Sequence, residues 1–394
     1  MRIAITNPTT WPYVRRGGER FINELARYLA ERGHEITILS GKPGRKEIRR
    51  EHGYTTIYHR RLWHPSLARI GVLEFHAFFL RCLPALLLHR YDVALCCTFL
   101  DSFAAILARR FTGTPCVFLV NSPPPAVQYF RSVTLGGGIF RRAMRDADEV
   151  VAPSRYMLEL LARTYGRGGV EIPVPVDLER FPLSRTRDHE RPIILCAAAL
   201  QDARKGGRLL FQAFDRLKQT RPSVRLQLVS PTPEPVAQEL LALVSPRWRA
   251  DVEFLNPTSE LPALFGAASI SVLPSLWEAF GMVVVESMAT GTPVVGTRDG
   301  ALPELIRDHG VGRLFDPGPT TGAAPTNLEG LVQALDEALT LSRDPETALG
   351  CRARAEEFGW ARVGPRFEEL FERLRIKAAG SGSERSRPAR ERAS

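Results

Sequence analysis

Apolar and polar residues follow two alternating patterns along this chain, and the patterns predict strands and helices in regular succession. Short runs of β-branched and other apolar residues, such as residues 2–6 and 35–40, are typical of strands. Residues 19–31 instead carry apolar side chains at helical spacing and end before Gly33, which favours a helix. Because strands separated by helices build parallel sheets, the pattern predicts an α/β fold.

The predicted elements fall into two sets. The first set has strands at residues 2–6, 35–40, 93–97, 116–120 and 149–152. The second set has strands at residues 193–197, 225–229, 252–255, 270–273 and 293–296, with helices at 207–218, 235–244, 261–265 and 283–289. Residues 171–192, between the sets, are rich in proline and charge, as linkers often are. We therefore expect two Rossmann-like parallel-sheet domains that face each other across a cleft.

The end of the chain is expected to hold one more helix and then a tail. Residues 365–376 place their large apolar side chains on one helical stripe. Residues 380–394 lack large apolar side chains, and this composition is typical of disorder. The resulting division is a domain at 1–175, a domain at 176–361, a helix at 362–378 and a disordered tail at 379–394.

The composition is that of an ordinary globular protein, with 394 residues, 44% of them apolar and 24% charged. No stretch reaches 18 uncharged apolar residues, so a transmembrane span is not expected. The N-terminus lacks the apolar core of a signal peptide. Most of the six cysteines lie inside apolar runs, which suits buried thiols in a reducing cytosol. We therefore expect a cytoplasmic protein.

The formal net charge is +10, and basic residues crowd the N-terminal part of the chain. Such a balance suits nucleic acid, an anionic membrane surface or an anionic substrate. No nucleic-acid-binding motif accompanies the charge, so nucleic acid is set aside. A solvated arginine-rich surface and peripheral contact with an anionic membrane, at its inner face, both stay open.

The most informative segment is residues 274–300, which place Glu278 and Glu286 eight positions apart. On one continuous helix these carboxylates would point about 80° apart. If a helix begins after Gly281, Glu278 lies in a loop and Glu286 in the first turns of that helix. The helix start between them offers free N–H groups and a partial positive charge, which suit a phosphate. Two acceptors for sugar hydroxyls beside such a helix start indicate a nucleotide-sugar site.

This segment resembles the family 4 retaining glycosyltransferases, which have the GT-B fold. Two glutamates separated by seven residues, with Phe280-Gly281 after the first, match the motif of that family, and Gly291, Pro293 and Gly300 follow. The resemblance extends over residues 2–376. It implies that the C-terminal helix packs back on the N-terminal domain.

The resemblance also implies roles for the residues of the motif. Glu286 would accept hydrogen bonds from the ribose of the nucleotide, and Glu278 would hold a hydroxyl of the donor sugar. The N–H groups of Phe280, Gly281 and Met282 would hold sugar or phosphate oxygens.

A basic pair, Arg204 and Lys205, follows the strand at 193–197. A cation at this point neutralises a leaving diphosphate. The family has an arginine just after the strand and a lysine before a glycine, and Lys205 matches that lysine. Ala199, or Leu200, occupies the position of the arginine, so Arg204 is the candidate for the missing charge.

Gly17 and Gly18 lie between the first strand and the first helix, where glycine lets the backbone approach a ligand closely. The resemblance implies that this loop abuts the donor diphosphate and the acceptor pocket; an ordinary strand-to-helix turn is the alternative. Many members of the family also carry a histidine near the reacting sugar. The matching segments here, residues 96–102 and 118–125, contain no histidine. The candidates to line that side of the sugar site are therefore Thr98, Asp101, Asn121 or Ser122.

These features together predict a hexosyltransferase-type enzyme that moves a sugar, with retention, from a nucleotide diphosphate sugar to an acceptor. The acceptor class stays open between a glycolipid, a polysaccharide and a small-molecule glycoside. No zinc-binding spacing occurs, and no metal cofactor is expected. A sugar-nucleotide epimerase of related fold and a non-catalytic nucleotide-sugar-binding partner are the alternatives.

Overall fold

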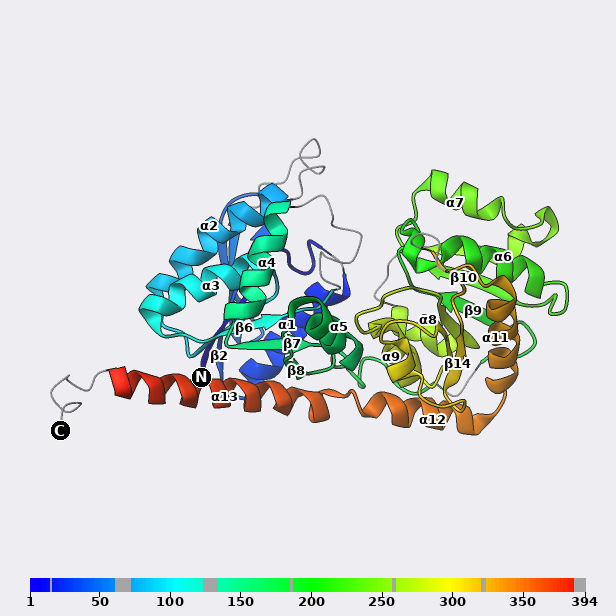
Figure 1. Cartoon of the computed structure of the whole chain (residues 1–394). Helices are drawn as coiled ribbons and strands as arrows, with labels where there is room; N and C mark the ends of the chain where they lie inside the picture. The colour runs from blue at the N-terminus through cyan, green and yellow to red at the C-terminus, as the bar shows by residue number, and fades with distance from the viewer. Residues whose placement is uncertain are drawn as a thin grey trace. The chain divides into compact units, whose positions relative to one another are not determined.

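The computed structural model describes residues 1–14, 16–60, 72–122, 134–184, 187–256, 260–319 and 324–385. The described residues fall into two compact units, 1–173 with 363–385, and Val174–Arg362. Each unit is an α/β assembly around one sheet (Figure 1). Two segments considered above, residues 123–125 and the last part of the tail, 386–394, lie outside the described residues.

The sheet of the first unit has eight strands in the order β3-β4-β2-β1-β5-β6-β7-β8. All neighbouring strands are parallel except β3 and β4, which are antiparallel. The strands are β1 (Arg2–Asn7), β2 (Glu35–Lys42), β3 (Glu47–Glu51), β4 (Tyr54–Arg60), β5 (Val93–Cys96), β6 (Cys116–Leu119), β7 (Glu149–Ala152) and β8 (Val170–Glu171). The central strands are buried along nearly their whole length, because helices cover both faces of such a sheet.

The helices of the first unit are α1 (Gly17–Glu31), α2 (Val72–Leu88), α3 (Phe99–Thr112), α4 (Thr134–Asp146), α5 (Arg155–Tyr165) and most of α13 (Trp360–Arg385). Local sequence fixes several helix ends. The side chain of Ser154 accepts a hydrogen bond from the Met157 N–H and caps α5. Gly113 and Gly166, both with left-handed backbone, end α3 and α5.

The hairpin of β3 and β4 was not predicted. Its turn at His52 and Gly53 has positive φ at both residues, 51° and 79°, as a two-residue hairpin turn requires. The sequence pattern missed it because β3 is a polar, mostly exposed edge strand without an apolar face. Part of the basic N-terminal charge, Arg49 and Arg50, belongs to this edge strand.

Helix α13 packs on the first unit. The ring of Phe367 lies 6.0 Å from that of Phe21 on α1, between ring centroids. Glu368 accepts a hydrogen bond from the Tyr28 hydroxyl at 3.2 Å and contacts His34 Nε2 at 3.1 Å. The helix continues to Arg385, so residues 379–385, expected in the tail, are helical instead.

The second unit has a six-stranded, fully parallel sheet in the order β11-β10-β9-β12-β13-β14. Its strands are β9 (Ile193–Cys196), β10 (Arg225–Val229), β11 (Val252–Leu255), β12 (Ile270–Leu273), β13 (Val294–Thr297) and β14 (Gly312–Phe315). The five strands predicted for this unit are all present, within one residue at each end. Numbered within the unit, the order is 3-2-1-4-5-6, that of a doubly wound Rossmann sheet.

Between and after these strands, the described residues form the 3₁₀ turns η3 (Ala203–Lys205) and η4 (Pro246–Asp251) and seven helices. The helices are α6 (Gly207–Leu217), α7 (Glu234–Leu241), α8 (Leu261–Ala267), α9 (Met282–Ala289), α10 (Leu302–Leu305), α11 (Leu328–Leu341) and α12 (Pro345–Glu356). In the described part of the chain, no helix is both long and apolar enough to cross a membrane.

Most of the segment interpreted as a linker, residues 171–192, is part of the second unit. Phe181 is buried, and the Arg187 guanidinium donates hydrogen bonds to the carbonyls of Ala268 and Thr290 at 3.1 and 2.9 Å. Proline and charge therefore mark an irregular segment that packs on the second unit rather than a free linker. The boundary between the units falls at Pro173, close to the predicted one.

The packing of α13 is open to a direct test. Phe367 is fully buried, so Phe367→Ala is expected to lower the free energy of unfolding of the first unit by about 3–5 kcal/mol. Ile376 lies on the same helix but is 60% exposed, so Ile376→Ala is expected to change it by less than about 0.5 kcal/mol. Denaturant titration of the two variants measures both values. Equal effects would contradict the packing described here.

Candidate functional site

The order of strands in the second unit reverses between β9 and β12, which are neighbours in the sheet. In open α/β sheets, ligands bind outside the carboxyl ends of the strands at such a reversal. Arg204 and Lys205 lie on η3, shortly after β9, and Glu278 lies in the loop after β12. The three side chains named from the sequence as catalytic candidates therefore come together at the point that the topology favours.

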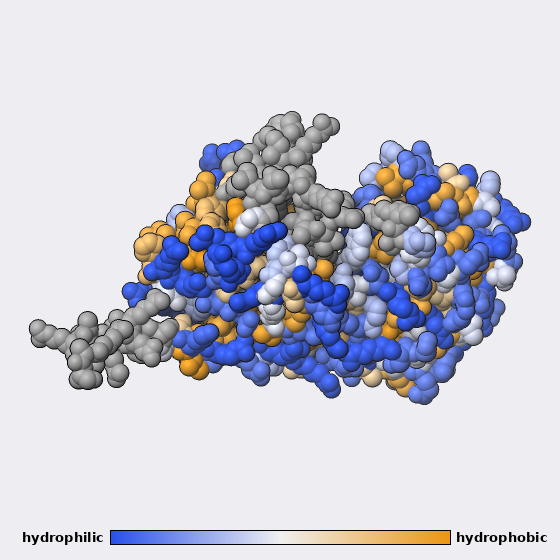
Figure 2. Space-filling model, viewed as in Figure 1, coloured by the Kyte–Doolittle hydropathy of each residue, from blue (hydrophilic) through white to orange (hydrophobic). Residues whose placement is uncertain are grey.

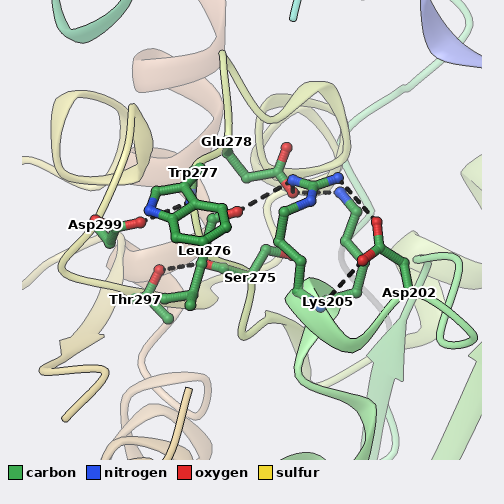
Figure 3. Close-up of polar contacts among 9 residues, drawn as sticks. Asp202, Lys205, Ser275, Leu276, Trp277, Glu278, Thr297 and Asp299 are labelled. Atoms are coloured by element: carbon green, nitrogen blue, oxygen red, sulfur yellow. Dashed lines mark hydrogen bonds and ion pairs between the residues drawn. The ribbon is translucent and has the colours of Figure 1, made fainter. Parts of the chain in front are cut away.

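Glu278 is the centre of this cluster, as the dashed contacts in Figure 3 show. The Lys205 ammonium forms an ion pair with Glu278 Oε1, and a guanidinium nitrogen of Arg204 lies 3.9 Å from the same oxygen. The guanidinium of Arg204 also lies 3.3 Å from Asp202 and donates to the Leu276 carbonyl at 3.1 Å. The three side chains of the cluster are 13–23% exposed, so they are shielded from water but still reachable.

The loop after β9 and the loop after β12 are held together through their backbones. The Leu276 N–H donates to the Arg204 carbonyl at 2.9 Å. Gly206 has a φ of 70°, and a Cβ there would lie 2.4 Å from the Pro274 carbonyl oxygen. Only glycine allows this approach, which brings Lys205 next to Glu278.

The backbone of Glu278 is fixed from its other side by residues 299–301. The Ala301 N–H donates to the Glu278 carbonyl at 2.9 Å. Gly300 has a φ of 62°, and a Cβ there would lie 2.7 Å from the Glu278 nitrogen. Trp277, which has an unusual positive φ of 56°, donates its N–H to the Asp299 carboxylate at 2.6 Å. Such strain persists only where the surroundings over-determine it, as they do here.

Helix α9 begins at Met282, with Gly281 as its N-cap at a φ of 106°. Glu278 is therefore in the loop and Glu286 in the helix, as the spacing required. The side chain of Phe280 is buried, its ring centroid 5.6 Å from that of Phe358, so this residue offers a ligand its backbone only. The first N–H groups of α9 have no partner within the helix, and they carry its positive dipole end. The Glu286 side chain is buried within the same unit.

The surroundings of the cluster hold no activated thiol. Cys196, the last residue of β9, is fully buried, and burial raises the pKa of its thiol to about 12. No three His, Cys, Asp or Glu side chains are grouped as metal ligands would be in the part of the chain that the structure describes. The charges of Arg204 and Lys205 are matched by those of Asp202 and Glu278.

Gly17 and Gly18 lie in the first unit, at the start of α1. The strand order of this unit reverses between β1 and β5, and α1, which begins with the two glycines, is the first helix after β1. A Cβ added to Gly18 would meet no atom within 4 Å, so the space over this turn is open. The start of α1 is held in place by Glu19, which is buried and accepts hydrogen bonds from Thr9 and Arg16.

Two of the residues proposed to take the place of the family's histidine near the reacting sugar have a structural role instead. Asp101 and Thr98 form a capping box at the start of α3, and Asp101 also accepts a hydrogen bond from the Thr6 hydroxyl at 2.6 Å. Burial raises the pKa of Asp101 to about 6. Because Asp101 is fully buried, it is not available to an acceptor. Asn121 differs, since its buried Oδ1 has no partner among the described residues.

Sequence reasoning missed the residues that fix the site. Asp202 accepts the Arg204 N–H at 3.1 Å and caps η3, and an aspartate before a short basic turn is a readable signal for such a cap. The contacts of Asp299 and Thr297 with the 275–277 backbone carry no local signal, because their partners are 22 residues away.

Two family models match this chain. One, described as Glycosyltransferase Family 4, matches residues 15–180, and the other, described as Glycosyl transferases group 1, matches residues 191–340. The chain belongs to glycosyltransferase family 4. It is therefore an enzyme of the transferase class, and the resemblance that the sequence showed is confirmed.

Similar proteins of this family occur in mycobacteria. The chain is 28% identical to the alpha-maltose-1-phosphate synthase of Mycolicibacterium smegmatis, over 70% of this chain and 78% of that protein. It is 25% identical to the glycogen synthase of Mycobacterium tuberculosis, over 94% of each.

Solved structures confirm the fold. The sucrose-phosphate synthase of Thermosynechococcus elongatus matches with a TM-score of 0.75, at 20% identity, over 95% of this chain and 98% of that one. HepE of Anabaena, in complex with UDP-glucose, matches with a TM-score of 0.70, at 18% identity, over 94% and 99%. The two-sheet architecture is the GT-B fold expected from the sequence.

The fixed backbone of Glu278 generates a prediction. Gly300→Ala and Gly166→Ala both place a side chain at nearly the same positive φ, 62° and 66°, which costs about 1–2 kcal/mol. Only the first also pushes a Cβ into the Glu278 backbone, since nothing lies within 4 Å at Gly166. We expect Gly300→Ala to fold, to melt at a lower temperature than Gly166→Ala and to lose sugar transfer, and we expect Gly166→Ala to keep transfer. Transfer rates and melting temperatures of the pair decide the matter, and equal transfer would contradict the role of Gly300.

Proposed function

We propose that this family 4 enzyme moves a sugar from a nucleotide diphosphate sugar to an acceptor with retention of configuration, and that it needs no metal ion. The observation that carries the proposal is the cluster of Lys205, Arg204 and Glu278 beside the start of α9, at the strand reversal. The names of similar proteins agree with such a donor. One is a GDP-mannose-dependent phosphatidylinositol monomannoside mannosyltransferase, and HepE has been solved with UDP-glucose.

The diphosphate of the donor is assigned to the two cations and the helix start. Lys205 and Arg204 offer ammonium and guanidinium hydrogens, and the N–H groups at Phe280, Gly281 and Met282 offer backbone donors. Both cations lie against Glu278, and Arg204 also lies against Asp202. A bound diphosphate supplies the negative charge that these cations otherwise take only from the protein, so they need little rearrangement to hold it.

The two glutamates are assigned to the hydroxyl groups of the donor. Glu278, in the loop, accepts from a hydroxyl of the transferred sugar, and Glu286, in the helix, accepts from the ribose. Gly17 and Gly18, in the first unit, keep the ligand-facing role that the family resemblance implies, and a Cβ at Gly18 would meet no atom within 4 Å. These assignments follow from the family resemblance and from the positions of the residues in each unit.

The reaction needs no covalent bond to the protein. The bond between the anomeric carbon and the diphosphate oxygen breaks with its electron pair left on the diphosphate, where Lys205 and Arg204 stabilise the charge. The acceptor hydroxyl oxygen forms the new bond on the same face of the sugar, which gives retention. Its proton passes to the departing phosphate oxygen. No thiolate is available beside the cluster, because the pKa of Cys196 is raised to about 12.

The first test of this function removes Lys205, one of the two cations assigned to the diphosphate. We expect Lys205→Ala to lower kcat by about 10²–10³, because one preorganised electrostatic contact to the leaving group is lost. The control is Lys46→Ala, at an exposed lysine in the first unit, which is expected to leave kcat unchanged. Steady-state transfer assays with both variants give the comparison. Near-wild-type turnover of Lys205→Ala would overturn the assignment of Lys205 to the leaving diphosphate.

Donor binding provides the second test. We expect one of the UDP-, GDP-, ADP- and TDP-sugars to raise the melting temperature of the wild-type enzyme, since it binds only the folded state. In Glu286→Gln, which keeps the shape of the side chain and removes its charge, the shift is expected to shrink or vanish. An unchanged shift in the variant would remove Glu286 from the ribose site. The melting temperature without ligand shows whether the variant is folded.

Product analysis separates the alternatives. Incubation with the donor that binds, and with an acceptor extract, is expected to give a glycosylated product. An isomeric nucleotide sugar in place of that product would indicate an epimerase. Donor binding with no product of either kind would indicate a non-catalytic partner. Activity that survives EDTA supports the metal-free reaction, and activity that EDTA removes and Mg²⁺ or Mn²⁺ restores would contradict it.

A further inference from the structure

Helix α2 in the first unit is apolar on two opposite faces. One face carries Phe78, Cys82 and Leu86, which are buried against the rest of the unit. The opposite stripe carries Leu80, Pro84, Leu87 and Leu88, all of them exposed. The exposed fractions of Leu80 and Leu88 are 69% and 80%. A helix that is apolar all round is normally covered on every side, so this stripe indicates a surface that contacts something other than water.

Basic residues border the apolar stripe. His89 and Arg90 follow the last residue of α2, and Arg110 precedes Phe111, which is 82% exposed near the end of α3. Figure 2 shows hydrophobic residues gathered over α2, with hydrophilic residues next to them over α3 and α4. Exposed apolar side chains beside arginines and lysines are the composition of surfaces that lie on a membrane.

Helix α4 contributes a basic pocket of about 510 Å³. It is lined by Gly138, Arg141, Arg142, Arg145, Thr164 and Tyr165. Asp146 pairs with Arg142 at 3.2 Å and with Arg145 at 2.7 Å, while Arg141 has no partner among the described residues. One carboxylate therefore pairs with two of the three guanidinium groups, and the pocket has an excess of positive charge that suits phosphate oxygens.

The pocket and the apolar stripe belong to one continuous surface. The ring of Phe79 on α2 stacks on that of Phe103 on α3, with centroids 6.0 Å apart. The guanidinium carbon of Arg142, which lines the pocket, lies 5.9 Å from the centroid of the same Phe103 ring. Phe79 and Phe103 are both half-buried, so the surface between stripe and pocket is also apolar and partly open.

We propose that this surface, defined by Leu80, Leu87 and Leu88 on α2 and Arg141, Arg142 and Arg145 on α4, docks the first unit on an anionic lipid bilayer. The leucines enter the boundary between headgroups and acyl chains, and the arginines bind headgroup phosphates. The net charge of the whole chain, +10, adds attraction over the longer range. The proposal goes beyond sugar transfer, and its test measures lipid binding, so that its failure and the failure of the proposed function are distinguishable.

Co-sedimentation with vesicles tests the docking. The full-length protein is expected to bind vesicles of phosphatidylcholine with phosphatidylglycerol at low salt, and to bind pure phosphatidylcholine far more weakly. Raised salt is expected to weaken binding, because exposed charges are screened. Equal binding to both kinds of vesicle, or binding to neither, would overturn the proposal.

Paired variants locate the surface. Leu80→Ser with Leu87→Ser removes the stripe, and Arg141→Gln with Arg145→Gln removes charge from the pocket. Each pair is expected to weaken binding by about tenfold or more. The matched controls are Leu349→Ser, at a 49% exposed leucine of the second unit, and Arg27→Gln, at an arginine of α1 with a 48% exposed side chain. If the control variants bind vesicles as weakly as the paired variants do, the binding depends on the general charge or hydrophobicity of the protein and not on this surface.

Two further measurements exclude other occupants. If inorganic phosphate at low millimolar concentration displaces the protein while the leucine variants bind normally, the pocket takes free phosphate and the proposal is wrong. If sedimentation velocity shows a dimer that the leucine variants abolish, and vesicles do not bind, the stripe contacts a second copy of the chain instead. Melting temperatures close to wild type confirm that these exposed substitutions leave the fold intact.

Discussion

The reversal of strand order between β9 and β12 is the constraint on which the candidate site depends. At this point two crossover connections leave the sheet in opposite directions, so the loops after β9 and β12 diverge from a shared edge and leave room for a ligand. Two glycines then bring the loops of the site into close contact. Gly206 lets one loop press on Pro274, and Gly300 lets a third loop press on Glu278. A side chain at either glycine would separate groups that must act together.

The ion pairs of the cluster are better understood as positioning than as stabilisation. Lys205, Arg204 and Glu278 are partly removed from water, and in such places the attraction between charges is largely offset by lost hydration. What the pairs provide is geometry, because both cations are held against the same Glu278 oxygen at the strand reversal. An electrostatically preorganised site of this kind needs little reorganisation during reaction. The absence of an activated thiol beside it agrees with a reaction that forms no bond to the protein.

The two units use the same sheet architecture for different surfaces. In the second unit, polar and charged groups gather at the strand reversal, where α9 contributes its N-terminus. In the first unit, the outer helices α2, α3 and α4 expose leucines and arginines well away from the Gly-Gly turn in sequence. A transferase with a lipid-linked or membrane-held acceptor would need both kinds of surface. The acceptor itself is not assigned by either.

The sequence alone determined the fold class, because buried parallel strands require continuous apolar runs. It also identified Glu278, Glu286 and Lys205 as candidate site residues. These signals are local, since each depends on neighbours within one motif. Tertiary structure decided the rest. Strand β3 has no apolar face that would predict its hairpin with β4, and the residues interpreted as a linker pack on the second unit through the buried Phe181. Asp101 looked available for chemistry in the sequence, but it is fully buried, forms a capping box with Thr98 and accepts a hydrogen bond from Thr6, 95 residues away. Likewise, only the folded chain brings Arg204 within reach of Glu278, 74 positions on, because hydrogen bonds between distant backbones leave no pattern along the chain.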